Sequence, residues 1–404
     1  MNMRTKIRKK DINTSFLAGF LALGVCAGLY AQGPQLSPEQ NSVITNARQG
    51  SVVELPGFLT EKLPLINYQK VVLPGPQYII SDDPEYIRFP EAIAIKEAVK
   101  PGAVRLYVYN VNGIKEPAEI DRKITALIRN TGKVPMHLRM LKYSSQKPSS
   151  NYFQIGKQGL ADFFASQGED RIRTVKPGEV IPLDEKLEKN IVKYNELVHG
   201  FYEFVVDQPA EVAVVQTSPQ TPGPEVLKRV KSVINSRHSN AGRGLFGVSN
   251  YEITTDSIYD TNMGAAQIML ADGKYDPWVS GRDASTGLPA KLAGNYGVMY
   301  EIEMKWKSTD GKGLALLTWN SRSADNKWCN GMAATMVVSA GKNKGGIVQL
   351  PSDRLITKGA PEAVVVQVFP PAKPGEVQTI KLTYSPPGAS CLPTPLVFVP
   401  VDLK

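Results

Sequence analysis

Four tryptophans in the last third of the chain are the residues whose type and spacing best suit ligand binding. Trp278, Trp306, Trp319 and Trp328 all lie between residues 278 and 328. Exposed indole rings stack on the apolar face of a sugar ring, and nearby amides bond its hydroxyl groups. We therefore take Trp306, Trp319, Trp328 and Asn326 as candidate sugar-binding residues. The alternative is a buried tryptophan core packed on a disulfide, a common arrangement in β-sandwiches.

A series of aspartates in the same region could bind calcium. Asp256, Asp260, Asp272 and Asp276 supply the oxygen ligands that hard cations prefer. Their spacing fits no EF-hand loop, and aspartate is also an ordinary turn residue. We expect no obligatory cofactor and keep calcium as an option at these four positions.

Catalytic patterns are weak. Glu301 and Glu303 alternate along an expected strand, about 7 Å apart by strand geometry, as in the carboxylate pair of a glycan-cleaving enzyme. Exposed acids on a sheet face are commoner. His137, His199 and His238 are far apart in the chain, and no serine elbow or phosphate loop is present. We predict that the protein is not an enzyme.

Cysteine usage favours one disulfide. Cys26 lies in the N-terminal leader, which leaves Cys329 and Cys391 for the rest of the chain. In an exported protein two cysteines commonly pair. The bond would close a loop of about 60 residues and stabilise the fold by roughly 4 kcal/mol in the chain-entropy model. Two buried free thiols are the alternative.

Residues 1–31 have the layout of a secretory signal peptide. A basic cluster between Arg4 and Lys10 precedes an uncharged apolar run at 15–31, with cleavage expected after Ala27 or Ala31. An uncleaved anchor, a lipoprotein attached through Cys26 and a buried core helix are the alternatives. We predict an extracytoplasmic location, with membrane contact only through an uncleaved leader.

The charge balance points away from nucleic acid. The net charge is +9, and five basic residues and one acid in the leader leave about +5 for the remainder, without a long basic run. A nucleic-acid-binding protein would show clustered basic residues with interleaved aromatics. The partner that we expect is a cell-surface protein or a polysaccharide.

Short apolar runs separated by turn residues predict a mostly β fold. The 34 glycines and 30 prolines divide the chain at short intervals, and several runs alternate polar and apolar residues. This pattern is typical of antiparallel sandwiches. The expected strands lie at 51–55, 69–73, 77–80, 104–111, 124–128, 136–141, 201–206, 211–216, 299–305, 314–319, 332–338, 362–369, 379–384 and 396–399.

A break in composition divides the expected domains. Residues 217–224 are rich in proline and precede the last of three short helices, which we expect at 158–167, 184–198 and 224–237. We predict two antiparallel β-sandwich-like domains with a few short helices. The expected divisions are a proline-rich segment of uncertain structure at 32–100, a first sandwich at 101–216, a linker with a helix at 217–245, and a second sandwich at 246–404.

One stretch resembles a known class of module. Lys123–Leu141 is an expected strand, the turn Asn130-Thr131-Gly132, and a second strand. It resembles the hairpins of immunoglobulin-like and adhesion-type modules in secreted bacterial proteins. The resemblance implies an extracytoplasmic β-sandwich and no catalytic residues. No family is recognised for the whole chain.

These patterns together predict an exported, non-catalytic protein of the cell envelope or surface with a structural or adhesive role. A carbohydrate-binding module that uses the C-terminal tryptophans is the alternative, and a glycan-cleaving enzyme is the less favoured one.

Overall fold

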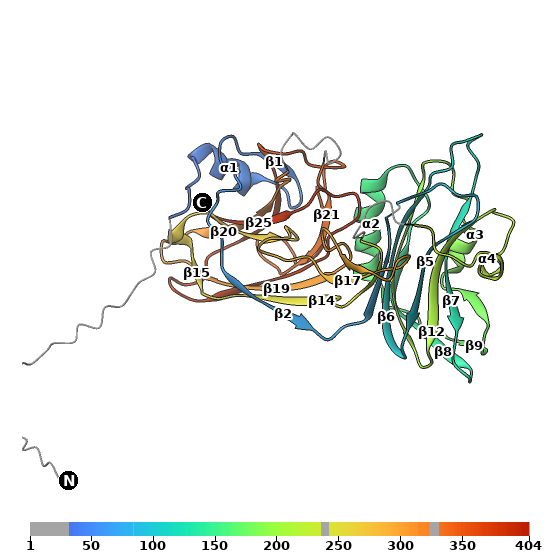
Figure 1. Cartoon of the computed structure of the whole chain (residues 1–404). Coiled ribbons are helices and arrows are strands. Elements are labelled where there is room, and N and C mark those ends of the chain that lie inside the picture. Colours follow the sequence, from blue (N-terminus) through green and yellow to red (C-terminus); the bar gives the residue numbers. More distant parts are fainter. Residues whose placement is uncertain (1–31, 84, 236–241, 323–330, 404) are drawn as a thin grey trace, which may run out of the picture. The chain divides into compact units, whose positions relative to one another are not determined.

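The computed structural model describes residues 32–83, 85–235, 242–322 and 331–403. These residues belong to one contact unit, Gln32–Lys404, which is separate from Met1–Ala31. The fold is mostly β, as predicted, and its strands form four sheets (Figure 1). The expected boundaries inside the unit stay predictions. No helix within the described ranges is both long enough and apolar enough to cross a membrane.

The first sandwich packs a four-stranded sheet on a nine-stranded sheet. The four-stranded sheet has the order β10-β7-β12-β5, and the nine-stranded sheet runs β18-β17-β13-β3-β6-β11-β8-β9, with β4 beside β6. Their bounds are β3 Gln77–Ser81, β4 Tyr86–Ile87, β5 Ala92–Val99, β6 Gly102–Asn112, β7 Lys123–Asn130, β8 Met136–Ser145, β9 Ile172–Val175, β10 Val180–Pro182, β11 Leu197–Val206, β12 Ala210–Thr217, β13 Gly244–Phe246, β17 Ser280–Asp283 and β18 Pro289–Lys291.

The second sandwich packs a five-stranded sheet on a seven-stranded sheet. Their orders are β1-β23-β20-β25-β16 and β2-β14-β19-β24-β21-β22, with β15 beside β19. Their bounds are β1 Val52–Glu54, β2 Tyr68–Leu73, β14 Asn250–Thr255, β15 Tyr259–Asp260, β16 Ala266–Leu270, β19 Met299–Lys307, β20 Gly313–Thr318, β21 Ala334–Val338, β22 Gly346–Leu350, β23 Glu362–Phe369, β24 Gln378–Tyr384 and β25 Thr394–Val401. A short 3-10 helix, η1, spans Thr261–Met263.

Strand β6 is buried on both faces. Val104, Leu106 and Val108 point into the core of the first sandwich. Tyr107 and Tyr109 point the other way, into the apolar cluster that also fills the second sandwich. This double burial explains why the strand is an almost continuous apolar run rather than an alternating one. The nine-stranded sheet therefore contributes to both cores.

One charged side chain of β6 is buried between the two cores. The Arg105 side chain is only 2% exposed. Its Nε donates to Glu203 at 2.8 Å, one terminal nitrogen donates to the carbonyl of Ser249 at 2.6 Å and of Gly297 at 3.3 Å, and the other to Asn250 Oδ1 at 2.8 Å. Glu203 lies on β11, while the other three acceptors flank β14 and β19. The guanidinium group thus joins the nine-stranded sheet to the second sandwich.

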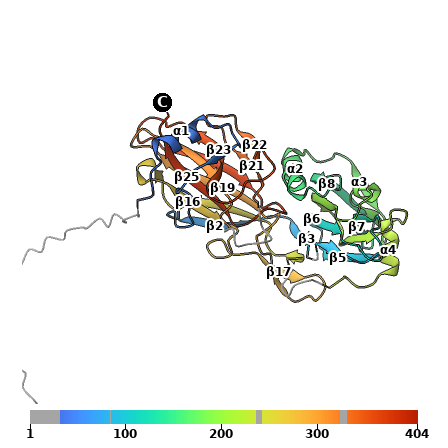
Figure 2. The ribbon, with the colours of Figure 1, turned by 90° about the horizontal axis from the view of Figure 1, so that it is seen from above.

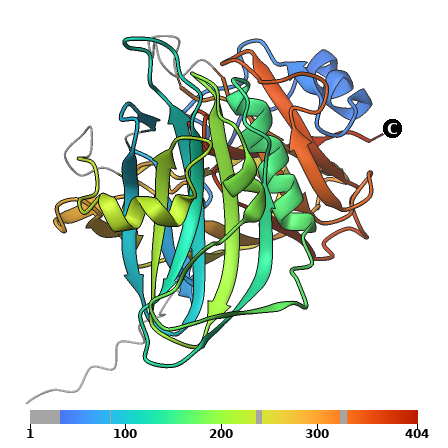
Figure 3. The ribbon, with the colours of Figure 1, turned by 90° about the vertical axis from the view of Figure 1, so that its right-hand side faces the viewer.

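The part of the chain that the structure describes contains four α-helices, which cover sheet faces and edges. Helix α1 is Pro38–Asn46, α2 is Tyr152–Ala165, α3 is Glu185–Lys189 and α4 is Gly223–Arg229. Helix α2 contacts β8 and β11 of the first sandwich and β21 and β22 of the second, and Figures 2 and 3 show it between the green and orange strands. Helix α4 lies on the outer face of the four-stranded sheet, where Val226 and Leu227 are buried.

Two expected helices are shorter than the sequence predicts. The helix predicted at 184–198 ends at Lys189, and Leu197 begins β11 instead. The one predicted at 224–237 ends at Arg229, and Val233 forms an isolated bridge to Ile93 of β5. In both places strand pairing with a neighbouring sheet overrides the helical apolar spacing.

The segment predicted to have uncertain structure at 32–100 is folded. Ser37 and Gln40 form a capping box at the start of α1. Ile44, Leu55 and Phe58 then pack on the outer face of the five-stranded sheet. The following strands β2 to β5 enter three different sheets, so this segment ties the sheets together.

The turn at Asn130-Thr131-Gly132 does not make a hairpin. Strands β7 and β8 form where the sequence predicts them, but β7 pairs with β10 and β12, whereas β8 pairs with β9 and β11. The turn therefore passes from one sheet of the sandwich to the other. The buried Asn130 side chain fixes it by donating to the carbonyls of Val134 and Val175 and by accepting from the Gly132 N–H.

We expect Arg105→Gln to lower the free energy of unfolding by about 3–5 kcal/mol, because it removes one partner of a buried ion pair and leaves buried acceptors without a donor. Urea denaturation measures the change. The matched control is Arg229→Gln, since Arg229 pairs with Glu91 at the surface, where water screens the pair and its loss should change stability little. Equal losses in the two variants would contradict the assigned importance of Arg105.

Candidate functional site

The tryptophans predicted to bind sugar are core residues where the structure describes them. Trp306 is 1% exposed between the two sheets of the second sandwich, and Trp319 is 5% exposed beneath the N-terminal segment. Neither ring presents a face to a ligand, so the sugar-binding assignment of these two residues is wrong. Their large apolar area is better buried in the two cores. Trp328 and Asn326 lie outside the described residues.

The four predicted calcium ligands are not gathered into a metal site. Asp276 is buried and accepts from Lys70, from the Ala271 N–H at 2.6 Å and from the Tyr300 hydroxyl at 2.6 Å. Its carboxylate is therefore already neutralised and hydrogen-bonded.

The other predicted ligands act in turns or lie at the surface. Asp272 accepts three backbone N–H groups of its own turn, and Asp260 caps η1 and accepts from Thr309. Asp256 is exposed. Within the described ranges, no group of three or more histidine, cysteine, aspartate or glutamate side chains could hold a metal ion.

The remaining candidate residues are also dispersed. Glu301 accepts from Thr383, and Glu303 lies 3.7 Å from Lys381, both on the outer face of β19. Cys391 is fully buried. Its predicted partner, Cys329, lies outside the described residues, so their pairing stays a prediction.

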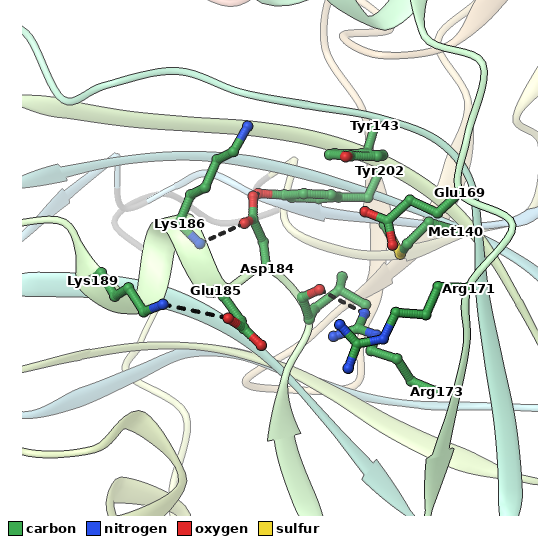
Figure 4. Close-up of a pocket in the computed structure, with 11 residues that line it drawn as sticks. Met140, Tyr143, Glu169, Arg171, Arg173, Asp184, Glu185, Lys186, Lys189 and Tyr202 are labelled. Carbon is green, nitrogen blue, oxygen red and sulfur yellow. Dashed lines mark hydrogen bonds and ion pairs between the residues drawn. The ribbon is translucent and has the colours of Figure 1, made fainter.

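A mixed-charge pocket at one end of the first sandwich is the best candidate site. We call it the β9–α3 pocket (Figure 4). Its volume is about 310 Å³. The strands β8, β9 and β11, helix α3 and the adjoining loops supply its lining residues, which are Met140, Tyr143, Glu169, Arg171, Arg173, Leu183, Asp184, Glu185, Lys186, Lys189 and Tyr202.

Tyr202 and Asp184 fix one wall of the pocket. The fully buried Tyr202 hydroxyl donates to Asp184 Oδ2 at 3.0 Å, and Asp184 Oδ1 accepts the Lys186 N–H at 2.7 Å, which caps α3. Burial, and then the negative charge of Asp184, raise the pKa of Tyr202 well above its usual range. The phenol therefore stays protonated and holds the carboxylate in place.

Two arginines point into the pocket, Arg173 from β9 and Arg171 from the residue just before that strand. Arg171 and Arg173 are two residues apart, so they share one face, while Ile172 between them points outward and is 56% exposed. Arg173 donates to the carbonyls of Pro182 at 2.9 Å and Leu183 at 2.8 Å. Figure 4 shows the two guanidinium groups side by side.

The pKa of Arg173 responds to its burial and to the charged side chains around it. Burial is the largest cause that lowers its pKa; the charge of Glu169 opposes this effect and the charge of Arg171 adds to it. No hydrogen bond or ion pair to the Arg171 guanidinium is found among the described residues. The pocket therefore holds two neighbouring guanidinium groups, of which Arg173 is fixed by two backbone carbonyls and Arg171 has no partner among the described residues.

The other acids of the pocket already have partners. A hydrogen bond to Glu169 is the largest cause that raises the pKa of Tyr143. Glu185 lies 3.4 Å from Lys189, one helical turn away in α3. Both acids thus accept bonds from pocket residues before any ligand is added.

A second hollow, of about 560 Å³, lies where α2 meets the loop after β22. Its buried cation, Lys157, donates to the carbonyls of Pro351 at 2.8 Å and Arg354 at 3.1 Å. This cation is used structurally, so the β9–α3 pocket remains the stronger candidate.

The sequence contains only one signal of this pocket. Arg171 and Arg173 alternate around Ile172, which places both on one face of any strand. Nothing local indicates that Tyr143, from an adjacent strand, and Asp184, from the start of a helix, face them. These contacts depend on sheet order and could not be read from the chain.

Comparisons with known proteins leave the chain without a family. No family model matches it, and no curated protein matches it in sequence. Among solved structures, a CUB1-EGF-CUB2 fragment of human MASP-1/3 has a TM-score of 0.18 at 9% identity, covering 76% of this chain and 100% of that one. An oxalate decarboxylase from Lactobacillus farciminis has a TM-score of 0.16 at 10% identity, covering 83% and 88%. At such scores neither likeness supports an inference.

Of the three histidines, the structure describes two. His137 is exposed on β8, and its Nδ1 lies 2.6 Å from Asp207 Oδ2. His238 lies outside the described residues. His199 of β11 is fully buried, with Tyr107 edge-on at 5.2 Å between ring centres. Neither of its ring nitrogens has a hydrogen-bond partner in the described parts of the chain.

A glycine of α2 makes this burial possible. A Cβ at Gly159 would lie 2.2 Å from the His199 ring, so the helix can cover the histidine only at a residue without a side chain. Burial lowers the pKa of His199 from 6.5 to about 4, although Asp162 partly opposes the shift.

We expect the protein to lose stability in acid through His199. Folding lowers the pKa of His199, so the unfolded chain takes up a proton at a higher pH than the folded protein does. The free energy of unfolding therefore has its full value above pH 6.5 and falls by about 3 kcal/mol as the pH decreases towards 4. Free energies of unfolding measured between pH 7 and pH 4 test this effect. His199→Leu should have a shallower pH dependence than the wild type, and identical slopes would contradict the assignment.

Proposed function

We propose that this chain is an exported, non-catalytic protein of the cell envelope or surface, with a structural or adhesive role. The leader pattern, the mostly β fold and the expected disulfide support this proposal. The partner would be a cell-surface protein or a polysaccharide.

The carboxylates of the β9–α3 pocket are the observation on which the proposal chiefly rests. A general acid or base must lie within hydrogen-bond reach of the proton that it transfers. Asp184 instead accepts from Tyr202 and from the start of α3, and Glu169 and Glu185 also have partners. Such an arrangement suits ligand binding by fixed hydrogen-bonding groups.

The acids considered for glycan cleavage favour the same proposal. A glycosidase places its two carboxyl groups on either side of the scissile bond. Glu301 and Glu303 lie on the outer face of β19, where a threonine and a lysine of β24 contact them. Neither lines one of the two hollows described above.

Carbohydrate binding remains the second candidate function, but at a different site from the predicted tryptophans. The loss of Trp306 and Trp319 to the cores removes the reason for a tryptophan platform. The β9–α3 pocket offers instead the half-buried ring of Tyr143 together with arginine and carboxylate side chains, a combination that suits a polar saccharide.

We expect the intact mass of the protein from its native envelope to lack roughly residues 1–27 or 1–31. Cys329 and Cys391 should resist alkylation until the protein is reduced, because the proposal has them paired outside the cytoplasm. Mass spectrometry before and after reduction makes both measurements. A full-length mass with two reactive thiols would contradict the cleaved leader and the disulfide together.

We also expect cells that lack the protein to attach less well to a surface or to show an altered envelope. Restoring the chain should reverse the defect, whereas a chain without residues 1–31 should remain inside the cell and fail to do so. Full restoration by that truncated chain would contradict an extracytoplasmic role.

A further inference from the structure

We propose that the β9–α3 pocket binds a carboxylated sugar, such as a uronic acid unit of an acidic polysaccharide. The inference rests on the proposed surface role and names the ligand of that contact. It follows from the side chains that line the pocket and from their existing partners.

The arginine pair would hold the carboxylate of the sugar. Arg171 and Arg173 share one strand face, and the bonds of Arg173 to Pro182 and Leu183 use two of its five N–H donors. These bonds fix the Arg173 guanidinium before any ligand arrives. Arginine binds carboxylates through pairs of parallel N–H···O bonds, which are stronger than neutral hydrogen bonds.

An anion would also relieve a repulsion within the pocket. Two guanidinium groups side by side repel each other, and partial burial weakens the screening by water. The lining contains four basic residues, Arg171, Arg173, Lys186 and Lys189, against three acids, Glu169, Asp184 and Glu185. Lys189 pairs with Glu185, and Arg173 donates to two carbonyls. The Arg171 guanidinium and the Lys186 ammonium have no side-chain partner among the described residues, so theirs are the positive charges that a ligand can neutralise.

The rest of the lining suits the hydroxyl groups and the ring of a sugar. A carboxylate has about four lone-pair sites, so Glu169 and Asp184 can accept further bonds from hydroxyls. The half-buried Tyr143 adds an aromatic face, and the buried side chains of Met140, Leu183 and Tyr202 lie beneath the pocket. A simple phosphate or sulfate ion would use only the arginines and leave these groups without a partner.

The size of the pocket limits the ligand. Small-molecule sites span roughly 300–1,000 Å³, and this pocket, at about 310 Å³, is at the lower limit. It can enclose one or two sugar rings. The pocket would therefore engage a terminal or locally exposed unit of a longer chain.

Calorimetric titration of the purified protein with trigalacturonate tests the proposal, with neutral galactotriose as the matched ligand. We expect binding of trigalacturonate alone, and weaker binding at high salt because screening reduces the ionic contribution. Arg171→Gln should weaken binding about tenfold or more, the usual effect of losing a charged hydrogen bond. Arg171 is exposed and bonds no backbone group of the described residues, so this variant should fold, which near-ultraviolet circular dichroism can check.

Arg139→Gln is the control variant. Arg139 lies on β8 opposite Ile172 in the strand pairing, so its exposed side chain points away from the pocket. This variant should bind trigalacturonate as the wild type does. Absence of wild-type binding, equal binding of galactotriose, or unchanged affinity in Arg171→Gln would each overturn the inference.

The two proposals can fail separately. An exported protein that does not bind trigalacturonate would refute the pocket assignment and leave the surface role standing. A protein that binds trigalacturonate but carries its leader and free thiols in the cytoplasm would refute the surface role instead.

Discussion

Arg105 occupies the position on which the rest of the structure depends. A guanidinium group taken out of water is destabilising unless its donors are paired, and here they meet a glutamate, two backbone carbonyls and an amide oxygen. Three of these acceptors belong to the second sandwich and one to the first. The charge can therefore stay buried only while both sandwiches are folded and in place.

The shared strand extends this constraint to apolar packing. Because β6 supplies side chains to both clusters, neither core is complete without it. Helix α2 adds a second link, since it packs on strands of both sandwiches and encloses His199 through Gly159. The β9–α3 pocket lies on the nine-stranded sheet that contains β6, so Arg173 of β9, Tyr143 of β8 and Tyr202 of β11 are held by hydrogen-bonded strands.

The strands were largely predictable, and their pairing was not. Short apolar or alternating runs located β6, β7, β19 and β23 to within two residues, because strand composition is a local property. The turn at Asn130 was expected to close a hairpin, yet it joins opposite sheets. The helix expected after Asp184 gives way to β11, whose residues pair with β6 and β8. Pairing depends on partners distant in the chain, so local pattern could not supply it.

The candidate site shows the same limit. Residue type suggested tryptophans for sugar binding and aspartates for calcium binding. Trp306 is instead buried in the core, and Asp276 forms an ion pair with Lys70. The residues that do form a pocket came from four elements, and only the alternation of Arg171 and Arg173 was visible in the sequence.

The claim that both sandwiches form one cooperative unit can be measured most directly by differential scanning calorimetry of the purified protein. We predict a single transition whose calorimetric and van't Hoff enthalpies agree, because Arg105 and β6 bind the two cores together. Two separate transitions, one for each sandwich, would contradict the account.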